Sequence, residues 1–211
     1  MTDAETTAPE YWEAFYADRT PRWSGGANAL LVEHTAGLQP GTALDLGCGQ
    51  GGDALWLGGG GWTVTGVDVS ASALGLAEEH AWAADLGGKI TWERHDLAET
   101  FPEGAFDLVS ACYLQSPVAI PREEILRRSA VAVAPGGTLL VVSHAGWPAW
   151  VTDADPTVVF RSAEGILEDL LLPAGAWVTE VVETVDRPVL DPDGAPATRP
   201  DNVVRVRRAS V

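Results

Sequence analysis

The sequence predicts one α/β domain built on a doubly wound, mostly parallel seven-stranded sheet, with an antiparallel hairpin formed by the C-terminal strands. Three observations predict it. Short apolar strands alternate with helical stretches from residue 42 to residue 145. A glycine-rich turn follows the first strand, and two long strands close the chain. Such alternation implies right-handed crossovers, which place helices on both faces of a parallel sheet.

The elements of the alternating region follow from apolar runs and from their flanking residues. Its five strands are expected at Thr42–Leu46, Trp62–Val67, Lys89–Arg94, Ala105–Ala111 and Thr138–Ser143. The helices between them are expected at Gly51–Leu57, from Ser70 as N-cap to about Asp85, and from Pro121 as first helical residue to just before Pro135.

The pattern changes after residue 145. A helix is expected near Ser162–Leu171, followed by two long strands at Trp177–Val185 and Asn202–Ala209. The segment Asp186–Asp201, rich in Pro, Asp and Gly, is expected to be the turn-rich connection between them.

The turn after the first strand indicates a nucleotide-type cofactor. Gly47, Gly49, Gly51 and Gly52 lack a Cβ, so their backbone can adopt positive φ and approach a ligand closely. Asp68 ends the second strand about twenty residues later, where a carboxylate accepts hydrogen bonds from both ribose hydroxyls. Three of the glycines satisfy G-x-G-x-x-G, so an NAD-dependent oxidoreductase is one interpretation.

Asp45 favours a different cofactor. It lies just ahead of Gly47, where its charge would repel a pyrophosphate but would suit an ammonium group. S-adenosyl-L-methionine carries an ammonium group and no phosphate. The oxidoreductase has no support beyond the glycines, because the chain has no Tyr-x-x-x-Lys pair and its only lysine, Lys89, lies in an expected strand.

Five motifs resemble those of the class I S-adenosylmethionine-dependent methyltransferases. They are Leu44–Gly51, Val67–Ser70, Arg94–Leu97, Phe106–Ser110 and Ala134–Val142, in the family's order across half of the chain. Tyr11–Glu13 and Trp23–Gly25 also look like the branch that holds tellurite-resistance and thiopurine methyltransferases. The resemblance implies a Rossmann-like domain over residues 1–211. Its parts would be an N-terminal helical lid (1–40), a cofactor-binding core (41–145) and an acceptor-side loop, helix and hairpin (146–211).

The resemblance also implies where the cofactor binds. Gly47 and Gly49 would lie against its methionine part, and Asp68 would hold the ribose hydroxyls. Asp96 would reach the adenine amino group with Leu97 beside it, although a turn cap is the alternative role for Asp96. The complete set of expected cofactor-binding residues is Trp23, Asp45, Gly47, Cys48, Gly49, Asp68, Val69, Asp96, Leu97 and Ala111.

Methyl transfer needs little catalytic machinery, because holding an acceptor in line with a strong methyl donor supplies much of the acceleration. His144, directly after the fifth strand, is the candidate general base, with passive lining of the pocket as the alternative. Tyr113 is the second catalytic candidate. The expected substrate-binding residues are Tyr11, Tyr16, Gln115, Trp147 and Trp150. Within this set, Tyr11, Tyr16 and also Trp23 would cover the cofactor, while the two later tryptophans would wall the acceptor pocket.

Composition limits the partners. A net charge of −17 argues against a nucleic-acid substrate, and no apolar run is long enough to cross a membrane. The two cysteines have no metal-ligand spacing, so no metal is expected. The N-terminus lacks the features of a signal peptide and arginine far outnumbers lysine, so we expect a cytoplasmic, bacterial protein.

The function expected from the sequence is methyl transfer to a small molecule through O, N or S/Se/Te, by a monomer or homodimer. A domain that binds S-adenosylmethionine without transferring its methyl group is the remaining alternative.

Overall fold

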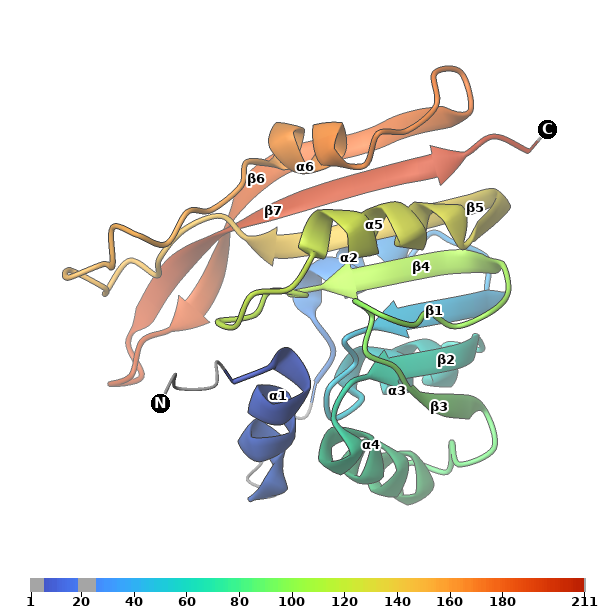
Figure 1. The fold of residues 1–211 in the computed structure, drawn as a ribbon, viewed down its shortest axis with the longest axis horizontal. Coiled ribbons are helices and arrows are strands. Elements are labelled where there is room, and N and C mark those ends of the chain that lie inside the picture. The colour runs from blue at the N-terminus through green and yellow to red at the C-terminus, as the bar shows by residue number, and fades with distance from the viewer. Residues whose placement is uncertain (1–5, 19–25, 211) are drawn as a thin grey trace, which may run out of the picture.

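The computed structural model describes residues 6–18 and 26–210, which contain one seven-stranded sheet with helices on both faces (Figure 1). The strands are β1 (Thr42–Leu46), β2 (Thr63–Asp68), β3 (Ile90–Arg94), β4 (Phe106–Cys112), β5 (Val133–His144), β6 (Trp177–Leu190) and β7 (Pro196–Arg208). The helices are α1 (Ala8–Ala17), α2 (Ala29–Thr35), α3 (Gly52–Gly59), α4 (Ala71–Ala83), α5 (Arg122–Val131) and α6 (Ala163–Asp169). The predicted fold class is confirmed.

The strand order is β3-β2-β1-β4-β5-β7-β6. Strands β1 to β5 are parallel, and β7 runs antiparallel to both β5 and β6. The chain winds outward from β1 to β3 and then crosses back to β4, so the order reverses between β1 and β4. Ligands of open α/β sheets bind at the carboxyl ends of the strands at such a point.

Two buried clusters flank the sheet because successive strand residues point to opposite faces. On one face, α5 and α6 contribute Leu126 and Ile166, which belong to the same cluster as Leu139 of β5. On the other face, α2 and α3 contribute Leu31 and Leu57 to a second cluster. None of the helices in the described ranges is long and apolar enough to cross a bilayer.

The hairpin differs most from the sequence prediction. Residues 186–201 were expected to be turn-rich, but 186–190 extend β6 and 196–201 begin β7, so only residues 191–195 connect the strands. Two of the prolines in this segment occupy positions where a strand tolerates them. Pro188 lies in the edge strand, and Pro196 is the first residue of β7. The extra length carries the hairpin past the carboxyl ends of the parallel strands (Figure 1).

Smaller differences occur at two other boundaries. Pro121 is the N-cap of α5 and not its first helical residue. Strand β5 begins at Val133, five residues earlier than expected, and its pairing with β4 shifts register between Phe106 and Leu108. This irregularity lets the strand pass through Pro135 and the two following glycines.

Candidate active site

The turn between β1 and α3 presents bare backbone at the carboxyl edge of the sheet. Gly47 and Gly49 have φ values of +71° and +53°, which L side chains rarely adopt. A Cβ on Gly49 would also lie 3.0 Å from the hydroxyl oxygen of Tyr16. The N–H groups of Gly47 and Cys48 donate to the carbonyl of Val67 at 2.8 and 2.9 Å, which ties the turn to the end of β2.

Asp68 connects the glycine turn to the beginning of α4. Its Oδ2 accepts the N–H of Gly49 at 2.9 Å, and its Oδ1 accepts the N–H of Ser70 at 2.9 Å. The side chain is buried, and burial raises its pKa while these two hydrogen bonds oppose the rise. Each carboxylate oxygen keeps a further lone pair, so Asp68 can still accept hydrogen bonds from a diol.

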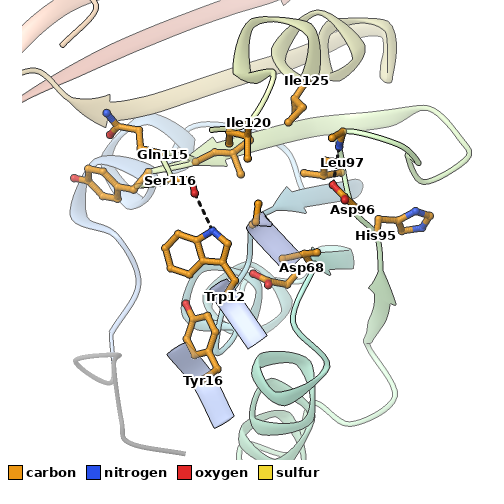
Figure 2. Close-up of a pocket in the computed structure, with 16 residues that line it drawn as sticks. Trp12, Tyr16, Asp68, His95, Asp96, Leu97, Gln115, Ser116, Ile120 and Ile125 are labelled. Carbon is orange, nitrogen blue, oxygen red and sulfur yellow. Dashed lines mark hydrogen bonds between the residues drawn. The ribbon is translucent and has the colours of Figure 1, made fainter. Parts of the chain in front are cut away.

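A cavity of about 130 Å³ opens beside Asp68, between α1 and the strand ends. Figure 2 shows Trp12 and Tyr16 on one side, with Asp68, Asp96 and Leu97 on the other. The cavity brings together the following residues expected at the site: Tyr16, Gly47, Asp68, Val69, Asp96, Leu97, Tyr113 and Gln115. Asp96 can act both as a turn cap and as a ligand of the adenine. Its Oδ1 accepts the N–H of Ala98 at 3.0 Å, and its side chain also lines the cavity.

A second, larger cavity of about 600 Å³ adjoins the first. Tyr16, Gly47 and Tyr113 line both, so these three residues mark where the two cavities meet. The remaining wall combines the glycine turn, Asp53 of α3, the residues before α2, and Arg187 of β6. The hairpin therefore contributes to the site.

Helix α1 covers the first cavity without burying any of its own side chains. Polar contacts at Trp12 and Glu13 hold it. Trp12 Nε1 donates to Ser116 Oγ at 3.2 Å, on the segment after β4. The Glu13 carboxylate accepts the hydroxyls of Ser70 and Ser72 at 2.8 and 2.6 Å, at the beginning of α4. Helix α1 thus bridges the segments that follow β2 and β4, and it lies within the stretch expected to act as a lid.

Comparison with known proteins gives the family. Residues 43–137, which include the glycine turn, Asp68 and Asp96, match the family described as Methyltransferase domain. Thiocyanate methyltransferase 1 of Brassica oleracea is 26% identical over 85% of this chain and 79% of its own length. A structure from work on the conversion of a disulfide bond into a thioacetal group during echinomycin biosynthesis is 26% identical, with a TM-score of 0.73 over 96% of this chain and 92% of that one.

This chain belongs to the class I S-adenosylmethionine-dependent methyltransferases. Its cofactor is S-adenosyl-L-methionine.

Other methyltransferases match over shorter stretches. The 27-O-demethylrifamycin SV methyltransferase of Amycolatopsis mediterranei is 33% identical over 67% of this chain and 54% of its own length. Ribosomal RNA small subunit methyltransferase C of Alcanivorax borkumensis is 32% identical over 60% of this chain and 41% of its own length. This chain therefore spans about half or less of these two relatives. TehB from Haemophilus influenzae, 17% identical with a TM-score of 0.69 over 94% of this chain and 67% of that one, shares the fold.

The observed donor set of this methyltransferase fits its cofactor. Gly47 lines both cavities with backbone alone, Asp68 offers free lone pairs, and Asp45 Oδ2 is buried without a hydrogen-bond partner in the described part of the chain. Asp45 and Ala111 nevertheless lie behind the cavity walls. Ala111 is fully buried in the core, and Asp45 is held by the hydroxyl of Ser110 at 3.0 Å. The expected contact from Trp23 falls outside the described residues.

Three carboxylates give the turn side of the site an acidic character. Burial, reinforced by the nearby carboxylate of Asp53, raises the pKa of Asp45 to about 8. Burial also raises the pKa of Asp53, against a 2.6 Å hydrogen bond from the N–H of Asn28. The carboxylates of Asp45, Asp53 and Asp68 are therefore poorly solvated as anions when no ligand is bound. A cationic ligand would stabilise their charged forms.

The hairpin side of the larger cavity is organised by Asp201, a fully buried carboxylate of β7. Its Oδ2 accepts hydrogen bonds from the Tyr113 hydroxyl at 2.7 Å and from Arg187 Nε, and its Oδ1 lies 2.8 Å from His144 Nδ1. Burial alone would raise the pKa of Asp201, but the hydrogen bonds from His144, Arg187 and Tyr113 hold it below its ordinary value. Burial, reinforced by Asp201, raises the pKa of Tyr113.

The candidate base lies behind this network. The His144 ring stacks on Tyr113 with centroids 4.4 Å apart, and Gln115 accepts the His144 backbone N–H at 2.7 Å. His144 itself lines neither cavity. Tyr113 does, and it has a φ of +54°, which a non-glycine residue adopts only when its surroundings impose it.

Three expected substrate-binding residues line neither cavity. Tyr11 packs edge-on against Trp12 with centroids 5.3 Å apart, and Trp147 packs edge-on against Phe160 at 5.7 Å. Trp150 is likewise absent from both walls. Their role in binding substrate stays a prediction.

Sequence reasoning missed several residues that the structure brings to the site. Trp12 and Glu13 lie inside the N-terminal motif that was quoted, and their helical position next to Tyr16 was the available signal. Arg187 and Asp201 lie in the segment assigned to a turn, and nothing local in the sequence marks them.

Glu13→Gln is predicted to loosen the lid. The substitution removes the charge that two serine hydroxyls bind, so we expect S-adenosylhomocysteine to bind about tenfold more weakly while the unfolding temperature changes little. Titration calorimetry checks this. Glu10→Gln is the matched control, because glutamine also serves at this position of the capping box. Equal affinities for the two variants would contradict the proposed anchor.

Asp45 is predicted to make the unliganded protein less stable as the pH rises. Its pKa is about 8 when folded, against about 3.9 in an unfolded chain. Between about pH 4 and pH 8 the folded protein therefore holds a proton on Asp45 that the unfolded chain releases. Its free energy of unfolding is highest below about pH 4 and falls as the pH rises toward 8. Asp45→Asn should flatten this decline and stabilise the protein at pH 8 by on the order of 1–3 kcal/mol. Urea unfolding from pH 5 to pH 8 measures it, and identical pH slopes for the two proteins would refute it.

Proposed function

We propose that this protein transfers the methyl group of S-adenosyl-L-methionine to a small molecule bound in the larger cavity. The observation that carries the proposal is that the two cavities meet at Tyr16, Gly47 and Tyr113. A cofactor held by Asp68 and the glycine turn has its methionine part at this junction. The larger cavity is of the size that small-molecule sites have.

Each part of the chain has a binding task in this proposal. Asp68 accepts the ribose hydroxyls, Asp96 the adenine amino group, and Gly47 and Gly49 allow close approach of the methionine part. Trp12 and Tyr16 of the lid exclude water from the first cavity. The bound cofactor supplies a methyl group on a positively charged sulfur, and the protein accelerates transfer mainly by proximity and orientation.

Sulfur is the acceptor atom that the comparisons favour. The relative and the structure that cover most of this chain are named for thiocyanate and for the conversion of a disulfide bond, both sulfur compounds. The relative named for 27-O-demethylrifamycin SV, which indicates oxygen, matches a shorter part. The likeness to TehB, at 17% identity, concerns the fold and does not select the tellurite-resistance branch.

A nucleic-acid acceptor is disfavoured by charge. One relative is named for ribosomal RNA, but this chain spans 41% of that protein. A net charge of −17 repels a phosphate backbone, whereas nucleic-acid binding depends on a basic surface.

His144 is the proposed base for acceptors that must lose a proton. An ionised Asp201 holds a proton on His144 Nδ1 and so leaves the lone pair on Nε2, which has no hydrogen-bond partner among residues 6–18 and 26–210. Tyr113 lines both cavities and stacks on the His144 ring, which lines neither, so His144 lies one residue away from the acceptor.

The cofactor is tested by titrating S-adenosylmethionine, S-adenosylhomocysteine and NAD into the protein and into Asp68→Asn. We expect the first two to bind, with affinity falling at least about tenfold in the variant because one acceptor for the ribose is lost. Asp85→Asn, at an exposed site, is the control. Binding of NAD alone would refute the proposed function. If S-adenosylmethionine bound but no thiol, amine or alcohol were methylated in a product screen, the protein would be a domain that binds the cofactor without transferring its methyl group.

His144→Gln is predicted to separate two kinds of acceptor. The kcat for a thiol or alcohol that is protonated at neutral pH should fall about a hundredfold, while that for an acidic thiol already ionised at neutral pH should stay near the wild-type value. The measurement is steady-state methylation of both acceptors by both proteins. An equal fall for the two acceptors would assign His144 a structural role.

A further inference from the structure

Two arginines face each other across the hairpin that borders the larger cavity. Arg187 of β6 is the direct register partner of Arg199 of β7. Like charges directly opposite each other destabilise an antiparallel pair. In a chain with a net charge of −17, such a pair is not explained by a generally basic composition.

Only one of the two positive charges is neutralised by a neighbouring carboxylate. Asp201 lies two residues after Arg199 and therefore on the same face of β7. Its hydrogen bonds come from Arg187, Tyr113 and His144. Within the described ranges the Arg199 side chain makes no ion pair or hydrogen bond, and its Nε is buried without a partner.

The unpaired guanidinium is partly removed from water. Burial lowers the pKa of Arg199, Asp201 opposes this effect, and the neighbouring Arg187 lowers the pKa further. An arginine stays protonated in proteins even so. A partly buried cation without a counter-charge is costly, and an anionic ligand would offset that cost.

Arg199 itself lines neither cavity, and it is connected to the larger one through its register partner, Arg187. Arg187 lines the larger cavity, and its guanidinium carbon lies 5.6 Å from the centre of the Tyr113 ring, at the junction of the two cavities. Asp53, together with the turn, forms the wall on the cofactor side. The larger cavity therefore has an acidic end toward the cationic cofactor and a cationic end at the hairpin.

We propose that Arg199, together with Arg187, binds the negative charge of the methyl acceptor, so that the acceptor is a small organic anion such as a carboxylate or a thiolate. The inference rests on the proposed methyl transfer, which defines this cavity as the acceptor site. Asp201 fixes Arg187 through Nε, and Arg199 offers its planar fork of donors to the ligand.

The test compares two thiols of similar size, mercaptoacetate, which carries a negative carboxylate, and its neutral amide, mercaptoacetamide. Each is titrated into the protein saturated with S-adenosylhomocysteine, at low ionic strength. Wild type should bind mercaptoacetate at least about tenfold more tightly than the amide, and Arg199→Gln should lose that preference. Arg199→Lys should retain part of it. Arg207→Gln, which removes the same charge at the opposite end of β7, should retain all of it.

The outcomes separate the inference from the proposed function. Failure of wild type to bind S-adenosylhomocysteine would refute the proposed function, whereas cofactor binding with equal or no binding of the two thiols would refute the anion site. A preference that survives in Arg199→Gln would also refute it. Arg199→Gln could also weaken the binding of S-adenosylhomocysteine and of mercaptoacetate by the same factor. The arginine would then bind the carboxylate of the cofactor, and the acceptor assignment would be wrong.

Discussion

The hydrogen bonds of the Asp68 carboxylate are the constraint on which the site depends. They fix the N–H groups of Gly49 and Ser70, and so set the glycine turn and the beginning of α4 relative to the end of β2. Ser70 in turn caps α4 and donates its hydroxyl to Glu13 of α1. The buried Asp68 carboxylate thus positions the glycine turn and helix α4. Through Ser70 it also positions helix α1. The same carboxylate is left with lone pairs that face the cavity.

The site places unfavourable charges at and behind both ends of the larger cavity, where Asp53 and Arg187 form the wall and Asp45 and Arg199 line neither cavity. Asp45 and Asp53 are acids whose charged forms are penalised by burial, and Arg187 and Arg199 are like charges in direct register. Each arrangement costs stability in the protein alone, and each would be relieved by a ligand of the opposite sign. Functional sites often reduce the stability of the protein in favour of binding. At such sites the local sequence preferences of a stable fold are expected to fail.

The sequence predicted the parts of the fold whose signals are local. Strands such as β1 are short apolar runs buried on both faces, and the glycines of the turn are required by positive φ at Gly47 and Gly49. The hairpin was misjudged because Pro188 and Pro196 suggest turns, although an edge strand and a first strand residue tolerate proline. Asp201 could not be found in this way, since only the pairing of β7 with β5 brings it opposite His144.

Opposite charges at the two ends of the cavity suit the chemistry that we propose. When an anionic acceptor takes a methyl group from a positively charged donor, both charges diminish as the new bond forms. Water stabilises the separated ions more than their less charged transition state, so excluding water favours the reaction, provided the protein supplies enough opposite charge to bind both ions. In this proposal α1 excludes water from the first cavity, and the carboxylates and arginines supply the opposite charges. Helix α1 and the β6–β7 hairpin, which lie far apart in the sequence, thereby act on the same step.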